Sequence, residues 1–377
     1  MRILVLNKEY PPVIGGAGIV SQNLAEEWAR MGHRVDVVTA RVKNSPKFEV
    51  INNVRVYRVP VFSRTGQTTP ATAGFYIVFG FLKSCQLFFK NRYDLINTHF
   101  AVLAGPAGAI LSKLFRVPNI LTIVGGDIYE PSKKLSPHNN VFLRWLVRWV
   151  LNNSSEVVAI SGNTKENAEK YYKPAKKIKV IPVGFRAPQF DKAGRNELGL
   201  DEDKIYLISV GRMAARKNFS VLLNAFSKVQ SGAAELLLIG DGPERKELEK
   251  AAENLGIGKR VHFLGAVSEE KKFQYLSCAD IFVLPSLHEG FGIVFQEAMY
   301  CGLPIIAGDN GGQTDFLKNN ENALLINPRD IDGIFFAIKK SIDSGVLRKK
   351  LGGKSKEDIE NFHICNNCEK EVDAWFY

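Results

Sequence analysis

Short apolar runs alternate with longer amphipathic segments along the whole 377-residue chain. An apolar run of ~4–8 residues fits a buried strand, whereas a segment of at least ~10 residues with apolar positions three and four apart fits a helix. Regular alternation of the two is typical of α/β architecture built on parallel sheets. We therefore predict two series of strands. The first covers residues 2–6, 34–39, 54–59, 95–97, 119–123, 156–160 and 179–181, and the second covers residues 205–210, 235–239, 261–264, 281–284, 304–307 and 323–326.

The chain length and the break between the two series predict two domains. A chain of this length exceeds what one hydrophobic core usually serves. Residues 183–200 contain Pro188 and Gly194 and have no clear hydrophobic period, so they are the best candidate for a linker. We predict two Rossmann-like, doubly wound α/β domains, residues 1–184 and 185–356.

The net charge of +11 is unevenly distributed. Residues 1–185 contain 25 Lys or Arg and 11 Asp or Glu, whereas the remainder contains 25 and 28. A basic half attracts phosphates, anionic lipid head groups or nucleic acid without specifying which, and it is also compatible with an ordinary soluble surface. No stretch reaches the ~18 uncharged apolar residues of a membrane span, and the apolar run at residues 1–6 is too short for a signal peptide. We expect a cytoplasmic protein.

The loop after the strand at 205–210 contains two cations, Arg212 and Lys217, behind a flexible Gly211. Loops at the carboxyl ends of strands in open α/β sheets are where ligands bind. Arg212 offers a rigid fork for phosphate oxygens and Lys217 a compact point charge, which suits a diphosphate. The alternative is that both are solvated surface charges.

A second loop with candidate ligand-binding residues follows the strand at 281–284. It carries Glu289, and the predicted helix that begins near Gly292 carries Glu297. A helix start offers unpaired N–H groups to an anion. Glu297 could accept hydrogen bonds from the two hydroxyls of a ribose, and Glu289 from those of a transferred sugar. Taken alone, each is compatible with an ordinary surface or turn acid, but the glycines on both sides of Phe291 favour close approach of a ligand.

Together these residues resemble glycosyltransferase family 4. The matching motifs are its E-x7-E element at Glu289 and Glu297, the E-A-M-x-x-G-x-P-I-I-A run ending at Ala307, G-R-x4-K at Gly211 to Lys217, L-I-G-D-G-P at 238–243, F-L-G at 263–265, Gly311-Gly312 and Gly15-Gly16. The resemblance extends over almost the whole chain, and the motifs occur in the order of the family.

The resemblance implies a GT-B fold, with two Rossmann-like domains facing across a cleft, and a retaining, metal-independent sugar transfer. It implies that Arg212 and Lys217 hold the diphosphate and that Glu297 holds the ribose. The catalytic set would be Glu289, Arg212 and Lys217, to which we add Asp127. The donor-binding set would be Gly16, Arg212, Lys217, Leu264, Val267, Glu289, Gly290, Phe291, Gly292, Ile293, Val294 and Glu297. No cofactor or metal is expected beyond a UDP-, GDP- or ADP-sugar as donor substrate.

One departure from the family pattern concerns the acceptor side. Many members carry a histidine after the strand equivalent to 119–123, where this chain has Val124-Gly125-Gly126-Asp127. Asp127 is the nearest polar substitute and could bind the acceptor or a sugar hydroxyl. His99 follows a neighbouring strand and is either an acceptor-side residue or a buried residue that supports the site.

The acceptor is expected in the basic first half, as a glycan or a lipid-linked or phosphorylated compound of envelope polysaccharide or glycolipid synthesis. Residues 75–92 and 142–149 are rich in aromatic and basic side chains. They could lie on an anionic membrane at the inner face, making the enzyme peripheral. The alternative is that Trp145 and Trp149 pack in the core. No nucleic acid is expected as a partner.

Three other classes of protein were considered. A nicotinamide enzyme is disfavoured because Gly15-Gly16-Ala17-Gly18 does not fit G-x-G-x-x-G. Among other GT-B enzymes, an epimerase leaves the two glutamates unexplained, and a phosphorylase needs a lysine motif for pyridoxal phosphate that this sequence lacks. An inactive nucleotide-sugar-binding protein stays open. The last residues, 357–377, are expected to form a helix packed on the first domain, and Cys365 and Cys368 have the spacing but not the companions of a zinc site.

Overall fold

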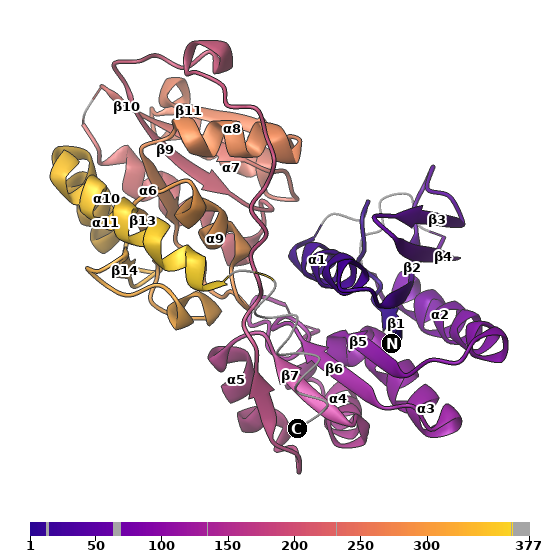
Figure 1. Cartoon of the computed structure of the whole chain (residues 1–377). Coiled ribbons are helices and arrows are strands. Elements are labelled where there is room, and N and C mark those ends of the chain that lie inside the picture. The colour runs from indigo at the N-terminus through magenta and orange to yellow at the C-terminus, as the bar shows by residue number, and fades with distance from the viewer. Residues whose placement is uncertain (13–14, 63–68, 134, 231, 363, 365–377) are drawn as a thin grey trace. The chain divides into compact units, whose positions relative to one another are not determined.

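The computed structural model describes residues 1–12, 15–62, 69–133, 135–230, 232–362 and 364. The chain forms two compact units, which are coloured from indigo to yellow along the sequence in Figure 1. The first contains Met1–Arg186 together with Phe362 and Ile364, and the second is Ala187–Asn361. Most of the predicted helix at 357–377, including Cys365 and Cys368, lies outside the described residues.

The first unit is built on a sheet with the strand order β3-β4-β2-β1-β5-β6-β7-β8. All neighbouring pairs are parallel except β3 with β4. The strands are β1 Arg2–Leu6, β2 Arg34–Arg41, β3 Phe48–Ile51, β4 Val54–Pro60, β5 Leu95–His99, β6 Asn119–Ile123, β7 Glu156–Ala159 and β8 Ile178–Val180. The predicted first series of strands is confirmed, with β3 as an addition.

Strand β3 forms a short antiparallel hairpin with β4 around Asn52 and Asn53. Both asparagines have positive φ, at 47° and 65°, which is the conformation that tight two-residue hairpin turns require. The prediction did not include this strand because it is short and carries no buried apolar run. The Asn-Asn pair between two β-rich segments was the signal that could have revealed it.

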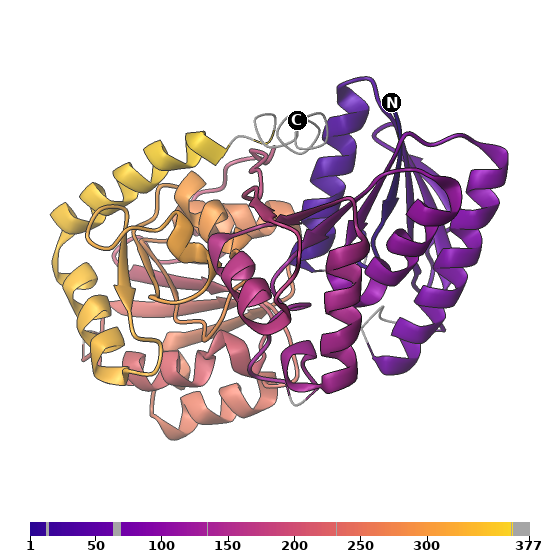
Figure 2. The same cartoon turned by 90° about the horizontal axis from the view of Figure 1, so that it is seen from below.

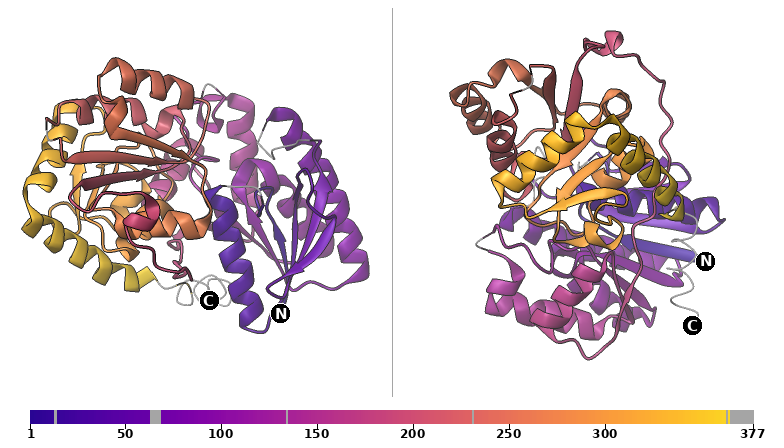
Figure 3. Two further views of the ribbon diagram at one scale, coloured as in Figure 1. Left: turned by 90° about the horizontal axis from the view of Figure 1, so that it is seen from above. Right: turned by 90° about the vertical axis from the view of Figure 1, so that its left-hand side faces the viewer.

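Helices cover both faces of the first sheet (Figure 3). Helix α1, Gly16–Arg30, packs on one face, where Leu24 and Trp28 share a core with Ile364. The other face is covered by a row of helices: α2 Pro70–Lys90, α3 Gly105–Phe115, α4 Val141–Asn153 and α5 Gly162–Tyr172. The chain returns to this unit at its end, since Phe185 N donates to Phe362 O at 2.6 Å and Ile364 N donates to Phe185 O at 3.1 Å.

The second unit has an entirely parallel sheet with the strand order β11-β10-β9-β12-β13-β14. Its strands are β9 Ile205–Val210, β10 Ala234–Ile239, β11 Val261–Gly265, β12 Ile281–Leu284, β13 Ile305–Gly308 and β14 Ala323–Ile326, which confirms the second predicted series. Its helices are α6 Phe219–Ser227, α7 Arg245–Asn254, α8 Glu269–Cys278, α9 Ile293–Tyr300, α10 Ile331–Asp343 and α11 Gly345–Asp358. They lie on both faces of the sheet (Figure 2).

Polar side chains begin many of these helices by accepting a backbone N–H of the first turn, which satisfies one of the donors left free there. The capping residues are Asn140 for α4, Ser161 for α5, Ser268 for α8, Asp330 for α10 and Ser344 for α11. Helix α9 is different, because it begins at a glycine without a side-chain cap. Its first N–H groups are therefore available to a ligand.

Two adjacent glycines of α11 provide a test of the packing in the second unit. A Cβ at position 352 would lie 2.1 Å from Gly302 O, whereas a Cβ at 353 would meet nothing within 4 Å. Gly352→Ala should lower the free energy of unfolding by about 1–3 kcal/mol. Gly353→Ala should raise it by about 0.5–1 kcal/mol, because alanine is the better helix former. Urea denaturation of both variants measures this, and two changes of the same sign would contradict the packing.

Candidate functional site

The loops that follow β9 and β12 meet at the point where the strand order of the second sheet reverses. These two strands are neighbours, and the chain proceeds outward from them in opposite directions. Such a switch point is the usual ligand site of an open α/β sheet. Lys217, at the end of the 3-10 turn Ala215–Lys217, comes from the first loop and Glu289 from the second. Lys217 Nζ donates to Glu289 Oε1 at 2.5 Å, and both side chains are buried.

The electrostatics of this pair depend on a second cation. Arg216 places its guanidinium 3.5 Å from Glu289 Oε2. Burial alone would raise the pKa of Glu289, but the charges of Lys217 and Arg216 and the hydrogen bond from Lys217 outweigh burial and lower it to about 2. Glu289 is thus ionised at neutral pH. Its contribution to stability is present above the ordinary pKa of a glutamate and is lost as the pH falls toward 2.

Backbone contacts hold the two loops in register. Asn218, in the left-handed conformation, donates from Nδ2 to Pro285 O at 3.1 Å and to Pro328 O at 2.5 Å. Leu287 N donates to Arg216 O at 2.8 Å. The loop after β13 closes on Glu289 from the other side, where Gly312 N donates to Glu289 O at 2.8 Å. Three strand-end loops therefore fix the position of one carboxylate.

Helix α9 begins beside this carboxylate. Gly292 has φ 93°, and a Cβ there would lie 2.6 Å from the ring of Phe295, so only glycine fits without strain. The predicted contact residues Ile293 and Val294 form the first turn of the helix and are half-buried. Gly290 is also half-buried in the loop. Phe291 is buried, and its ring lies 4.9 Å from that of Phe316, so its side chain serves the core.

Glu297 is buried on α9 and pairs with a residue that the sequence did not indicate. Lys272, on α8, donates to Glu297 Oε1 at 2.7 Å and to Glu269 Oε2 at 2.7 Å. The other carboxylate oxygen, Glu297 Oε2, has no hydrogen-bond partner among the described residues. Burial raises the pKa of Glu297, and the ammonium of Lys272 opposes that rise. The carboxylate therefore keeps one free acceptor for a hydroxyl.

The remaining predicted donor residues lie at the same edge of the sheet. Arg212 is exposed in the loop after β9, and its side chain makes no hydrogen bond or ion pair with any described residue. Leu264, in β11, and Val267, in the loop after it, are half-buried. Gly240 brings the loop after β10 against the first loop, since a Cβ there would lie 2.0 Å from Gly211 O. The structure thus collects these residues from four consecutive strand ends.

In the first unit, the corresponding edge carries Gly16, at the start of the helix after β1, and His99, the last residue of the neighbouring strand β5. Gly16 is exposed at the start of α1. His99 is fully buried, neither ring nitrogen has a hydrogen-bond partner in the described part of the chain, and burial lowers its pKa to about 4. It is a neutral imidazole at physiological pH. Phe100, which follows it, has φ 72° and opens a short π-helical turn, Phe100–Ala104.

Asp127 is engaged by that turn. Its Oδ2 accepts a hydrogen bond from Ala101 N at 2.7 Å, and its Oδ1 accepts one from Val124 N at 3.0 Å. Burial raises the pKa of Asp127 to about 6, although these N–H donors favour its ionised form. Both oxygens accept backbone N–H groups, so the carboxylate links the loop after β6 to the turn after β5.

Sequence reasoning missed Arg216, Lys272 and Asn218. Arg216 and Asn218 flank Lys217 in a loop already recognised as cationic, so their proximity to the pair was a usable signal. Lys272 precedes Glu297 by 25 residues on another helix, and nothing in its local sequence distinguishes it from the exposed Lys271.

Comparisons of sequence now place this geometry in a family. The family described as glycosyl transferases group 1 matches residues 191–358, and the one described as Glycosyltransferase Family 4 matches residues 14–186. The chain belongs to glycosyltransferase family 4. The fold and family that the sequence motifs predicted are thereby confirmed, and the chain is a glycosyltransferase.

Individual relatives agree over their full length. An uncharacterized glycosyltransferase of Methanocaldococcus jannaschii is 29% identical, with 99% of this chain and 97% of the relative covered. An Escherichia coli UDP-Gal:alpha-D-GlcNAc-diphosphoundecaprenol alpha-1,3-galactosyltransferase is 25% identical, with 99% and 97% covered. Among solved structures, sucrose-phosphate synthase of Thermosynechococcus elongatus has a TM-score of 0.88 at 24% identity, covering 99% and 98%. The Anabaena protein HepE, solved with UDP-glucose, has a TM-score of 0.78 at 20% identity, covering 100% and 99%. These structures show a GT-B fold.

Asp127→Asn should destabilise this glycosyltransferase. An amide has one acceptor oxygen, so one of the two backbone N–H groups loses its partner, at a cost of about 1–3 kcal/mol. Because the folded-state pKa is raised to about 6 from 3.8, the folded protein holds a proton there that the unfolded chain has released. The stability of the wild type over the variant should therefore shrink as the pH rises from about 4 to 6. Urea denaturation across this range measures it, with exposed Asp191→Asn as the control.

Lys272→Met should leave Glu297 buried without its cation and cost about 3–5 kcal/mol. Adding Glu297→Gln to that variant should recover much of the loss, because the unpaired charge is then removed. The measurement is the free energy of unfolding for both single variants and the double variant. Lys271→Met, on the exposed side of the same helix, is the matched control, and a loss equal to that of Lys272→Met would show that the pairing is unimportant.

Proposed function

We propose that this enzyme transfers a sugar from a nucleoside diphosphate sugar to an acceptor hydroxyl, with retention of anomeric configuration and without a metal ion. The observation that carries the proposal is the arrangement at the switch point of the second sheet. A buried, ionised Glu289 lies between Lys217 and Arg216, beside the uncapped start of α9. Arg212, exposed in the same loop, adds a cation that pairs with no other described residue.

The donor occupies these groups in a definite order. The diphosphate binds Arg212, Lys217 and the N–H groups of Ile293 and Val294, because a helix start and two cations together favour a polyanion. The ribose hydroxyls bind the free oxygen of Glu297. Glu289 accepts hydroxyls of the transferred sugar, and the base rests near Leu264 and Val267. UDP is the favoured nucleotide, since it accompanies a protein of this fold and is named in the donor of the E. coli relative.

The chemistry follows from where charge develops. As the bond between the anomeric carbon and the diphosphate oxygen breaks, negative charge collects on the leaving phosphate, where Arg212, Lys217 and the start of α9 stabilise it. The acceptor oxygen attacks from the same face, and its proton passes to the leaving phosphate. This mechanism needs no protein base. It is therefore compatible with an Asp127 whose two oxygens both accept backbone hydrogen bonds. We assign Asp127 the role of holding the acceptor-side loop.

The acceptor is proposed to be a lipid-linked or other envelope glycan. The E. coli relative is named for a diphosphoundecaprenol acceptor, and the first unit of this chain is strongly basic. The enzyme would work at the cytoplasmic face of a membrane, as a peripheral protein.

Thermal denaturation with UDP, GDP and ADP, all at one concentration, tests the donor. The nucleotide of the true donor should stabilise the fold most, by about 2.7 kcal/mol where that concentration is 100 times its Kd. Arg212→Ala should fold normally, since Arg212 is exposed, yet lower the rate of sugar transfer or donor hydrolysis by about 10²–10³. Lys217→Ala and Glu289→Ala should abolish turnover. Exposed Lys246→Ala is the control. Full activity in Arg212→Ala would refute the assignment of the donor site. Loss of activity with EDTA would refute metal independence.

A further inference from the structure

The exposed apolar side chains of this protein are concentrated in the first unit. Among the described residues, 17 large hydrophobic side chains are exposed, and only Phe336 and Val346 belong to the second unit. Nine of the others lie on three consecutive helices: Phe75, Val78, Leu82 and Phe89 on α2, Ile110 and Leu114 on α3, and Val141, Phe142 and Trp145 on α4. An isolated exposed hydrophobic residue needs no explanation, but a concentration of this kind marks an interaction surface.

Helix α2 shows the arrangement most clearly. Its exposed apolar residues are spaced by three, four and seven positions, which places them on a single stripe. The opposite side of the helix is anchored in the unit, where Leu87 is buried and the hydroxyl of Tyr76 donates to Val38 O at 3.0 Å. Residues 71–90 have the length and apolar composition of a membrane span. Because one side of α2 packs on the sheet, we interpret the helix as lying along a surface rather than crossing it.

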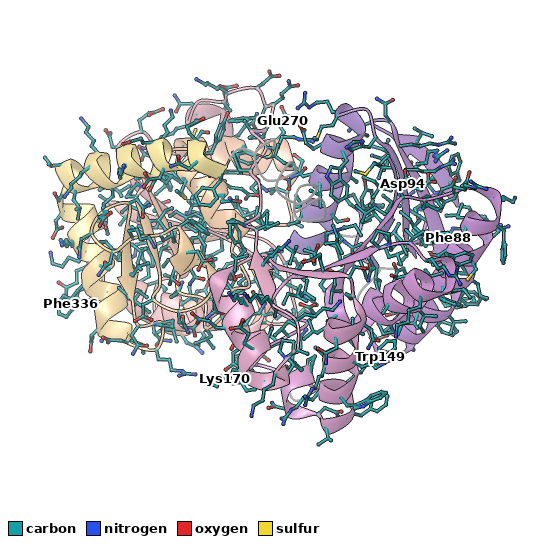
Figure 4. The ribbon with its side chains drawn as sticks, turned by 60° about the horizontal axis from the view of Figure 1, so that its bottom comes forward. Phe88, Asp94, Trp149, Lys170, Glu270 and Phe336 are labelled. Atoms are coloured by element: carbon teal, nitrogen blue, oxygen red, sulfur yellow. The ribbon has the colours of Figure 1, made fainter. Side chains whose placement is uncertain are left out.

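The apolar surface continues across the neighbouring helices. Phe88 on α2 stacks on Phe115 at the end of α3, with ring centres 4.2 Å apart, and Lys113 on α3 lies 5.8 Å from the ring centre of Trp149 on α4. Phe88 and Trp149, labelled in Figure 4, are half-buried and also pack against the core beneath these helices. We call the exposed side of α2, α3 and α4 the helical face.

The exposed charges of this region are almost all positive. Residues 61–155 include ten Lys or Arg and three Asp or Glu. Asp127 and Glu130 are buried, so Asp94 is the one exposed acid among the described residues of that stretch. Helices α2, α3 and α4 contain no acidic residue at all and carry Lys83, Lys90, Lys113, Arg144 and Arg148. An apolar stripe bordered by cations is the pattern of a helix that lies in the interface of an anionic bilayer.

We propose that the helical face docks on an anionic lipid membrane, with Phe75, Val78 and Leu82 of α2 and Phe142 and Trp145 of α4 entering the head-group region. This inference rests on the proposed function and identifies the surface through which the enzyme would reach a lipid-linked acceptor. A second copy or a protein partner would cover an apolar face equally well. Only an anionic surface also matches a face with five cations and no acids, and it attracts each cation near the surface.

Sedimentation of the full chain with vesicles tests the proposal. Binding should be strong to vesicles with 30% phosphatidylglycerol and weak to pure phosphatidylcholine, and it should fall as salt rises. Lys90→Gln with Arg148→Gln should lower the partition coefficient by about fivefold for each cation removed. Val78→Gln with Leu82→Gln should lower it at least tenfold. The matched control, Phe336→Gln with Val346→Gln, removes exposed apolar residues of the second unit and should change nothing.

Equal binding by the helical-face variants and the control pair would overturn the proposal, as would equal binding to both kinds of vesicle. A concentration-dependent dimer that the Val78 and Leu82 variant abolishes would assign the face to a second copy instead. Stabilisation by UDP, measured on the same samples, separates this result from the proposed function. Unchanged stabilisation with no vesicle binding refutes the docking alone, whereas vesicle binding without stabilisation refutes the donor assignment alone.

Discussion

The buried ion pair between Lys217 and Glu289 is the interaction on which the donor side depends. Removing two charges from water costs several kcal/mol per ion, and their attraction repays this only when the geometry is well fixed. Hydrogen bonds fix this geometry. Asn218 links the loops after β9 and β14, and Gly312 N donates to the backbone oxygen of Glu289. A buried pair of this kind is weak evidence for stability. Its place at the switch point of the sheet argues that these charges are retained for a ligand.

The sequence predicted the two sheets and the residues of the donor loops because both depend on local patterns. Strand-length apolar runs, glycines and the E-x7-E spacing can all be read along the chain. The sequence could not predict the ion pair of Lys272 or the hydrogen bonds of Asp127, because each joins residues that only folding brings together. Glu297 meets Lys272 across two helices, and Asp127 meets Ala101 across two strand ends. For the same reason, the sequence could not indicate that both oxygens of Asp127 accept backbone hydrogen bonds.

The two units differ in what their polar groups can offer. In the second, Arg212 and one oxygen of Glu297 have no hydrogen-bond partner among the described residues, so both are available to a ligand. In the first, His99 is fully buried as a neutral imidazole, and both oxygens of Asp127 accept backbone hydrogen bonds. Neither is poised to take a proton from an acceptor. This asymmetry supports a mechanism in which the leaving phosphate accepts that proton, since its oxygens gain negative charge as the bond to the anomeric carbon breaks.

Electrostatics act over two different distances in this protein. The charges around Glu289 are buried within hydrogen-bond range, where salt screens them little. The cations of the helical face are dispersed over α2, α3 and α4, and their attraction for an anionic surface extends only about 8 Å at physiological ionic strength. Burial makes the first set specific, since the surrounding groups hold each charge in one geometry. Exposure makes the second set additive, since every cation contributes a similar small amount wherever it lies. Recognition of one nucleotide needs the first arrangement, whereas retention on a fluid lipid surface, which offers no fixed partner, needs the second.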